Sequence, residues 1–203
     1  MARWEPDAAG RLAEAAMQLY RERGFDRTTV ADIAARAGLT ERTFFRYFAD
    51  KREVLFSGAG TLQEFLVDQV ASAPASLPPI DVVAGALAET GQLFEQRRDF
   101  ARHRHALIVA HAELHERELI KLAALATAIG EALRRRGVPA PAASLAAEAG
   151  MTIFKRAFGA WVEDGKKRDL GHHVRAAHAE LEGVVVGTRR PRAPAGRARR
   201  GSR

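Results

Sequence analysis

The stretch that decides the fold runs from Thr28 to Lys51 and reads TTVADIAARAGLTERTFFRYFADK. It predicts two short helices joined at Gly38, because glycine adopts the left-handed turn that ends a helix without steric cost. Thr29 and Thr40 are the residue type that caps the first turn of a helix through a hydroxyl. Apolar residues follow each cap at helical spacing, namely Val30, Ile33, Ala34 and Ala37, then Phe44 and Phe48. The unit is a helix-turn-helix, in which two short helices cross at a steep angle.

The face of the second helix that packing leaves free carries residue types that suit the major groove of DNA. Arginine can bond guanine edges, threonine and tyrosine can bond phosphates, and an aromatic edge can contact the methyl group of thymine. An ordinary helical hairpin with a solvated charged face gives no reason for so many rings and arginines on one short helix. The expected DNA-binding residues of this helix are Thr40, Arg42, Thr43, Phe45, Arg46 and Tyr47.

The same stretch resembles the N-terminal domain of TetR-family transcriptional regulators, over roughly residues 8 to 56. The matching residues are Gly24, Phe25, Thr29, Val30, Ile33, Ala34, Ala37, Gly38, Thr43, Phe48 and Lys51. The resemblance implies that the third helix enters the major groove, while Thr29 and Lys51 contact phosphates from the N-termini of the second and fourth helices. A helix N-terminus suits an anion because it presents free amides and the positive end of the helix dipole. The family often has tyrosine where this chain has Phe45, which favours an apolar base contact over a phosphate bond.

Composition sets further limits on the kind of protein. The 203 residues include no cysteine, which excludes disulfides and thiolate metal sites and fits a reducing compartment. No run of about 18 apolar residues could span a bilayer, and residues 1–10 lack the apolar core of a secretion signal. We therefore expect a soluble, cytoplasmic protein without a membrane partner.

The formal net charge of +7 is concentrated at one end of the chain. Residues 188–203, TRRPRAPAGRARRGSR, hold seven arginines and no acid, so the other 187 residues carry 25 basic and 25 acidic side chains. Proline and glycine predict that this tail is disordered. The tail either adds salt-sensitive attraction to any DNA sequence or serves only as a solubilising end. Affinity for a specific DNA site must come from individual residues elsewhere.

Apolar periodicity predicts helices along the whole chain and no strand, so the expected fold class is all-α. A helix at residues 7–23 completes a three-helix head, and a fourth helix, capped by Asp50 and continuing to about Ser72, links the head to the body. Prolines make residues 73–79 a connection. Later helices are expected at residues 81–98, 99–111, 114–136, 142–164 and 170–186. The predicted domains are the DNA-binding head (1–56), a helical-bundle body for ligand binding and dimerisation (57–187) and the Arg-rich tail (188–203).

The body carries bulky apolar residues on four predicted helices. In the TetR family this region binds a small effector between helices and pairs with a second copy. Such residues are the usual wall of a bundle cavity and equally the usual filling of a core. The candidate effector-binding residues are Phe94, Leu107, Ile108, Leu122, Leu125, Ile129, Phe154, Phe158 and Trp161.

A second resemblance runs from about Arg97 to Trp161. The segments ALIVAHAELHERELIKLAALATAIGEALRRRG and SLAAEAGMTIFKRAFGAWV resemble the C-terminal domain of regulators of the mycofactocin-associated type. The resemblance implies a small apolar effector, such as a long-chain acyl-CoA, with an anionic head. Four arginines near the start of this segment could bind such a head or could form a solvated face, namely Arg97, Arg98, Arg102 and Arg104.

The last two predicted helices are rich in small residues, which allow helices to approach closely. These residues are Ala143, Ala146, Ala147, Gly150, Ala157, Gly159, Ala160, Ala176, Ala177 and Gly183. They suit either a four-helix seam between two copies or packing within one chain. We favour the seam, because paired heads on a palindromic double-stranded DNA operator require a two-fold symmetric homodimer.

Neither a metal site, a cofactor nor catalytic machinery is expected. His111 and His115 stand four residues apart, a spacing that can ligate zinc, but a third ligand is not evident. The chain also lacks GxSxG, Walker and Rossmann glycine motifs. The leading hypothesis is a ligand-released repressor without enzymatic activity. The alternative is an all-helical acyl-binding protein or enzyme with an attached DNA-targeting head, using the region around His111 and His115.

Overall fold

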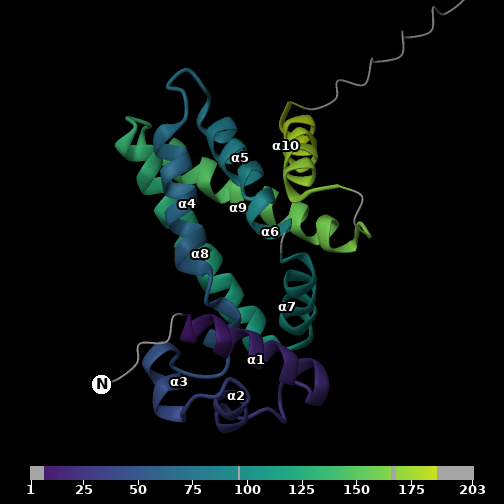
Figure 1. The fold of residues 1–203 in the computed structure, drawn as a ribbon. Coiled ribbons are helices and arrows are strands. Elements are labelled where there is room, and N and C mark those ends of the chain that lie inside the picture. The colour runs from purple at the N-terminus through teal and green to yellow at the C-terminus, as the bar shows by residue number, and fades with distance from the viewer. Residues whose placement is uncertain (1–6, 96, 166–167, 187–203) are drawn as a thin grey trace, which may run out of the picture.

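The computed structural model describes residues 7–95, 97–165 and 168–186, which form an all-α fold as the sequence predicts (Figure 1). In chain order the elements are α1 (Ala8–Arg23), α2 (Val30–Arg36), α3 (Glu41–Tyr47), the 3₁₀ helix η1 (Glu53–Phe56), α4 (Ala59–Ser72), α5 (Pro79–Glu89), α6 (Gly91–Glu95), α7 (Arg98–Ala110), α8 (Ala112–Arg135), α9 (Ala140–Glu163) and α10 (Leu170–Val186). These described ranges contain no strand. Within them, no helix combines the length and hydrophobicity needed to cross a membrane.

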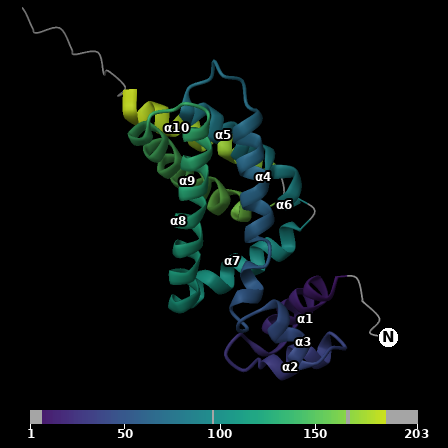
Figure 2. The same cartoon turned by 90° about the vertical axis from the view of Figure 1, so that its left-hand side faces the viewer.

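The head consists of α1, α2, α3 and η1, and it lies at one end of the molecule (Figures 1 and 2). Its core includes the fully buried side chains of Leu12, Ile33 and Phe44. Two buried residues of the body, Ile108 on α7 and Leu114 on α8, belong to the same core. The core of the head is therefore closed by side chains from the body.

The turn between α2 and α3 is built around a left-handed glycine. Gly38 has a φ of +68°, and its amide donates a hydrogen bond to the Ala35 carbonyl at 3.1 Å. The Leu39 amide donates to the Ala34 carbonyl at 2.8 Å. This pair of bonds satisfies the last carbonyls of α2, and the backbone conformation requires glycine. The predicted helix-turn-helix is confirmed.

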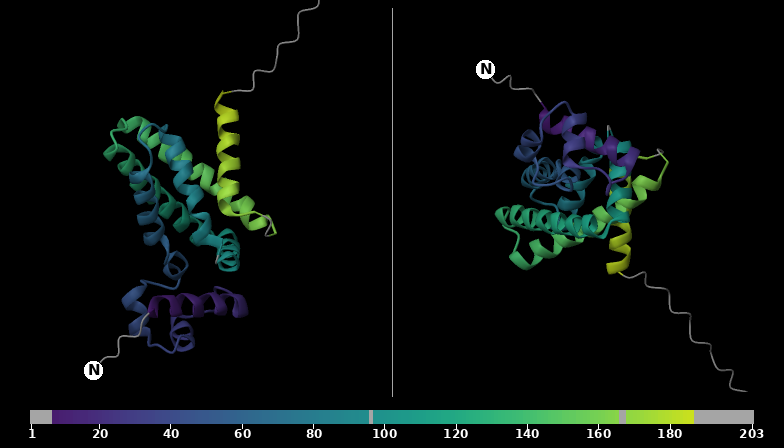
Figure 3. Two further views of the ribbon diagram at one scale, coloured as in Figure 1. Left: turned by 45° about the horizontal axis from the view of Figure 1, so that its top comes forward. Right: turned by 90° about the horizontal axis from the view of Figure 1, so that it is seen from below.

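The body comprises α4 to α10, and α9 packs against α8, α5 and α10. Glycine permits the close contact between α9 and α5, because a Cβ on Gly150 would lie 2.3 Å from Val83 Cγ1. The C-terminal end of α10 points away from the head (Figure 3). The two ends of the molecule are thus occupied by different elements, the helix-turn-helix at one end and α10 at the other.

The expected continuous helix from Asp50 to about Ser72 is wrong. The chain forms η1 first, and α4 begins only at Ala59. The three consecutive residues Val54, Leu55 and Phe56 are all buried in the head core, and one face of an α-helix cannot hold three consecutive side chains. Gly58, just before α4, also has low helix propensity. Asp50 caps η1 instead, because its carboxylate accepts hydrogen bonds from the backbone amides of Arg52 and Glu53 at 2.8 and 3.0 Å.

Other boundaries differ less from the predictions. The predicted helix at 81–98 is divided into α5 and α6 at Thr90, whose hydroxyl donates to the Leu87 carbonyl at 2.7 Å. A single residue, His111, separates α7 from α8. Helix α9 begins two residues early, at Ala140, because proline is tolerated in a first helical turn. The bounds of α10 are as predicted, and the tail at 188–203 lies outside the described residues.

Candidate nucleic-acid interface and effector cluster

Threonine caps begin both helices of the helix-turn-helix, as predicted. The Thr29 hydroxyl accepts from the Asp32 amide at 3.1 Å and donates to the Asp32 carboxylate at 2.6 Å. Hydrogen bonds from Thr29 hold the pKa of the Asp32 carboxyl below its usual range, so this group stays negative. The Thr40 hydroxyl accepts from the Thr43 amide at 3.2 Å. A phosphate near Thr29 would therefore meet the Asp32 carboxylate as well as the amides of α2.

The outer face of α3 presents the predicted DNA-binding side chains to solvent. Arg42, Phe45, Arg46 and Tyr47 are exposed, and Thr43 is half-buried. The Phe45 ring is 56% exposed although its neighbour Phe44 is fully buried. Arg46 lies over the ring of Tyr47 at 4.8 Å and donates to the Tyr47 hydroxyl at 2.9 Å. The structure brings these side chains together on the outer surface of α3.

Lys51 contacts the loop before α2, and together with Phe45 it lines a hollow of about 330 Å³. Its ammonium donates to the carbonyls of Phe25, Thr28 and Asp26 at 2.8, 2.9 and 3.2 Å. It also lies 4.5 Å from the centre of the Phe25 ring. The expected position of Lys51 at the N-terminus of the fourth helix is wrong, because α4 begins eight residues later. Its three ammonium donors all have protein partners, so the geometry indicates a residue that positions the loop.

Ion pairs join the head to the body beside this loop. Arg117 on α8 contacts Glu53 at 2.9 Å and Asp50 at 3.3 Å, and Lys121 one turn later contacts Glu53 at 3.3 Å. Burial opposes ionisation of Asp50, but hydrogen bonds from Arg52 and from two backbone amides outweigh it and lower its pKa. Sequence reasoning did not predict these ion pairs. The four-residue spacing of Glu113, Arg117 and Lys121 on one helix face was the available signal.

The head–body contact also holds two residues that were expected in the effector cavity. Ile108 is buried in the head core, and Leu107 packs against the same core. The apolar spacing of α7 correctly indicates buried residues, but it cannot tell which core buries them. Leu107 and Ile108 are therefore corrected from a cavity wall to the contact between head and body.

The other seven candidate effector residues all meet in the core of the body. Phe94, Phe154, Phe158 and Trp161 form a cluster, hereafter the aromatic cluster, with ring centres 5.5 to 6.3 Å apart. Leu125 and Ile129 are buried in the same core, and Leu122 packs against it half-buried. The structure thus brings together seven of the nine candidates.

Two polar side chains, Arg98 and His105, border the aromatic cluster. Arg98 is only 7% exposed and lies 4.8 Å from the centre of the Trp161 ring. The Arg98 Nε and Trp161 Nε1 atoms are buried without a hydrogen-bond partner among the described residues, although the Glu95 carboxylate forms an ion pair with Arg98 Nε at 3.6 Å. The ring centres of His105 and Phe158 lie 5.6 Å apart. Burial lowers the pKa of His105, so its neutral form is favoured. A bound molecule with an acceptor group could satisfy the two unpartnered donors.

The four arginines that were candidates for an anionic head group lie in different environments. Arg97 and Arg102 are exposed, whereas Arg98 borders the aromatic cluster. Arg104 faces the head, where it donates to the Leu55 carbonyl at 2.6 Å and pairs with Glu118 at 2.6 Å. Among the four, Arg98 is therefore the one that adjoins the apolar candidates.

The small residues of α9 and α10 are used largely within the chain. Ala143, Ala146, Ala147, Gly150, Ala157 and Ala177 are buried. Ala160 and Gly159 are half-buried, and Ala176 and Gly183 are exposed. Arg156 on α9 pairs with Glu180 on α10 at 3.4 Å, beside a hollow of about 80 Å³ lined by Ala160 and Ala176.

Comparisons with known proteins agree with this geometry. Residues 12–57 match the family described as bacterial regulatory proteins, tetR family. Residues 77–185, more than half of the chain, match the MftR C-terminal domain. The chain belongs to the TetR family. TetR-family regulators bind DNA operators, respond to small ligands and usually act as dimers, and the exposed face of α3 lies within the residues that match the tetR family.

Individual proteins similar to this chain include one transcriptional regulator and two solved structures. The regulator TcmR of Streptomyces glaucescens is 33% identical over 75 residues, which cover 37% of this chain and 33% of TcmR. The match thus spans about a third of that relative. FadR of Thermus thermophilus, solved with lauroyl-CoA, has a TM-score of 0.55 at 24% identity over 94% of this chain and all of FadR. A complex of SmeT with triclosan has a TM-score of 0.60 at 20% identity, covering 87% of this chain and 90% of SmeT. These two structures share the fold of this chain.

Proposed function

We propose that this TetR-family regulator is a ligand-released repressor that binds a palindromic operator as a homodimer and catalyses no reaction. The observation that carries the proposal is the placement of two neighbouring residues on α7. His105 packs against Phe158 in the aromatic cluster, whereas Arg104 contacts Leu55 in the head. A molecule that displaces the contact between His105 and Phe158 also shifts the contact between Arg104 and Leu55, because the two residues are adjacent on α7. One helix thus connects the candidate effector region to the candidate DNA-binding region.

DNA recognition is assigned to α3. Arg42 and Arg46 reach guanine edges in the major groove, and Phe45 contacts a thymine methyl group. Thr40, Thr43 and Tyr47 contact phosphates and fix the position of the helix. Thr29 contributes from the N-terminus of α2. Lys51 acts through the loop it holds, because its ammonium already bonds three carbonyls.

The effector is assigned to the class of long-chain acyl-CoAs and similar apolar molecules. Its apolar part would lie against the aromatic cluster, and an acceptor group would meet the unpartnered Arg98 Nε and Trp161 Nε1. The lauroyl-CoA bound by the similar FadR structure supports this class. The triclosan bound by the similar SmeT structure makes a smaller phenolic molecule the second class to test.

Release of DNA follows from helices that belong to both regions. Besides α7, α8 contributes Leu114 to the head core and Ile129 to the body core. A shift of either helix on effector binding moves the head relative to its copy in the dimer. Paired heads must meet half-sites about one helical turn apart, so a small change in their separation weakens binding. By reciprocity, DNA weakens effector binding by the same factor, a coupling of typically about 1–3 kcal/mol.

The dimer seam is assigned to the outer faces of α9 and α10. Leu145 on α9 is 72% exposed, and Val184, Val185 and Val186 at the end of α10 are 78%, 76% and 82% exposed. Burial of such apolar side chains between copies would stabilise a dimer by the hydrophobic effect. A second copy of both helices would complete a four-helix arrangement.

The test combines DNA affinity with effector titration. Fluorescence anisotropy of a labelled operator fragment should show weaker DNA binding in the presence of lauroyl-CoA, but not of free coenzyme A. Arg98→Met should reduce the response, whereas Arg97→Met, an exposed neighbour, should leave it unchanged. A response to triclosan alone would select the phenolic class. Turnover of acyl-CoA would favour the alternative of an enzyme with a DNA-targeting head, and DNA affinity that no added molecule changes would contradict ligand release.

A further inference from the structure

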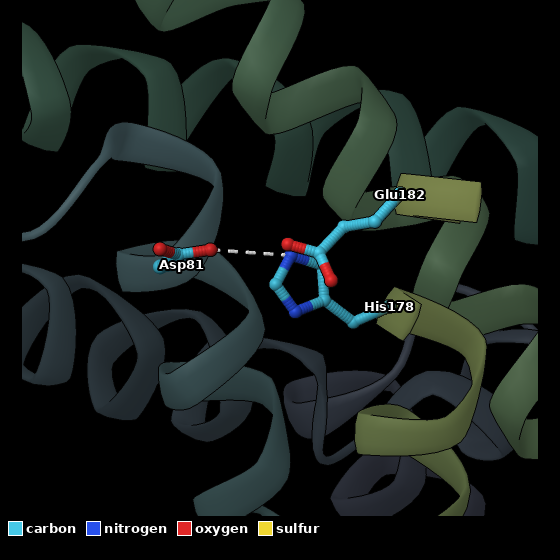
Figure 4. Close-up of side chains that lie close together, drawn as sticks. All are labelled: Asp81, His178 and Glu182. Atoms are coloured by element: carbon cyan, nitrogen blue, oxygen red, sulfur yellow. Dashed lines mark ion pairs between the residues drawn. The ribbon is translucent and has the colours of Figure 1, made fainter. Parts of the chain in front are cut away.

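Three side chains of types that can ligate a metal meet where α5 packs against α10. Asp81 lies in the first turn of α5, and His178 and Glu182 stand four residues apart on α10 (Figure 4). One possible ligand atom from each of the three residues lies within 4.8 Å of the other two. Nothing in the proposed DNA-binding or effector function uses these residues.

The protein leaves the hydrogen-bonding capacity of the His178 imidazole partly unused. Its Nε2 atom is buried and has no hydrogen-bond partner among the described residues, although Asp81 Oδ1 lies 3.3 Å away. A buried nitrogen without a hydrogen bond costs free energy, so such a group in a folded protein calls for a further partner. A metal ion is a partner that an imidazole lone pair and two carboxylates can share.

We propose that Asp81, His178 and Glu182 bind a divalent first-row transition-metal ion that fastens α10 to α5. Ligand atoms about 2.1 Å from one tetrahedral ion lie about 3.4 Å from each other. The 3.3 Å separation of His178 Nε2 and Asp81 Oδ1 already fits this geometry. Glu182 is exposed, so a change of side-chain rotamer can bring its carboxylate closer.

The donor set selects the class of ion. Calcium and magnesium prefer sites made only of oxygen ligands, and copper(I) prefers thiolates or thioethers. One imidazole with two carboxylates suits Zn²⁺, Co²⁺ or Mn²⁺, with water completing the coordination. Sequence inspection alone did not reveal the site, because Asp81 comes 97 residues before His178 and only the fold brings them together.

The alternative reading is a plain ion pair between Asp81 and a protonated His178. The two readings differ in their response to the ion. A metal that binds the folded state alone raises thermal stability with the logarithm of its concentration once that concentration exceeds the dissociation constant. A simple ion pair gives no such response. Because α10 is also a candidate dimer helix, the ion would stiffen that helix without contacting DNA.

The experiment uses the untagged full-length protein after treatment with a chelator. Calorimetry with ZnCl₂ should show one saturable site per chain, and Co²⁺ should give visible absorption bands typical of a nitrogen- and oxygen-liganded ion. His178→Gln should reduce affinity by about 100-fold or more, since even outer-shell changes commonly cost 10- to 100-fold. Glu182→Gln, at an exposed position, should weaken binding with little effect on folding, which circular dichroism checks.

His115→Gln is the matched control, because His115 is an exposed histidine on α8, away from α10. It should leave zinc affinity and the cobalt spectrum unchanged. Equal zinc binding by wild type and His178→Gln would overturn the proposal, as would the absence of saturable binding by the wild type. Tighter binding of Mg²⁺ than of Zn²⁺ would overturn the assigned class of ion.

Discussion

The outer face of α3 and the aromatic cluster differ in how side chains become available for function. On α3 the candidate residues are those that packing leaves exposed, such as Phe45 beside the buried Phe44. In the body the candidates are the residues that packing itself uses, such as Phe158 and Trp161. A surface for DNA can therefore be recognised because it carries aromatic and charged side chains that the core does not use. A site for an apolar effector is made of the same residues as the core.

The pair Phe44 and Phe45 gives the largest expected effect and tests this contrast directly. Phe44→Ala should lower the free energy of unfolding by about 3–5 kcal/mol, because it removes a fully buried ring from the head core. Phe45→Ala should change stability by less than about 0.5 kcal/mol but should weaken operator binding. Urea unfolding and DNA anisotropy measure the two quantities. Equal losses of stability in both variants would break the distinction between packed and exposed rings.

Lys51 provides the second largest effect, and it separates a positioning role from a phosphate contact. Lys51→Met should destabilise the head by about 1.5–3 kcal/mol, because the ammonium bonds to three loop carbonyls are lost. The dependence of operator affinity on salt should stay unchanged. A phosphate contact instead predicts that the slope of log affinity against log salt falls by about one unit per site. A lower slope with full stability would restore the role implied by the family resemblance.

Arg46 is expected to affect DNA reading without affecting the fold. Arg46→Ala should cost about 1–3 kcal/mol of operator affinity and relax the preference at one position of each half-site. Arg36→Ala is the control, since Arg36 is an exposed arginine on α2 that pairs with Glu22 at 2.8 Å. Binding to a library of operator variants distinguishes the two. If both variants keep the wild-type preference, Arg46 contacts no base.

His105 gives the smallest effect, and it reports on the body alone. Its folded pKa is lowered by burial, so below the unfolded value of about 6.5 the unfolded chain binds a proton that the folded protein does not. The free energy of unfolding should therefore fall as the pH drops from about 6.5 towards the folded pKa. His105→Phe should remove this part of the pH dependence, measured by urea unfolding at several pH values. An unchanged profile would show that His105 is solvated.

Local signals in the sequence were sufficient for much of the head. Gly38, Thr29 and Thr40 each act within a few residues of their own position, so their roles could be predicted without a tertiary structure. The start of α4 could not be predicted in this way, because the consecutive burial of Val54 to Phe56 depends on the rest of the head core. Leu107 and Ile108 show the same limit. Periodicity indicated that they are buried, and only the fold decides that α7 delivers them to the head.

The polar part of the candidate effector region was also beyond local reasoning. Four arginines lie within eight residues, and no sequence feature singles out Arg98 from Arg97 or Arg104. The direction in which each arginine side chain points depends on the residue at which α7 starts and on the helices packed around α7. The unpartnered state of Arg98 Nε and Trp161 Nε1 is visible only when all neighbours are in place.

The contribution of Ile108 and Leu114 to the head core has a consequence for the construction of chimeric regulators. A hybrid made by transferring residues 1–56 alone onto a foreign sensor would leave a hole where these two side chains insert. The acceptor would also need cations to match Asp50 and Glu53. A transplant should therefore carry the facing surface of α7 and α8 together with the head. The unit to transfer is therefore defined by packing and not by one cut in the sequence. It consists of residues 1–56 together with the parts of α7 and α8 that face them.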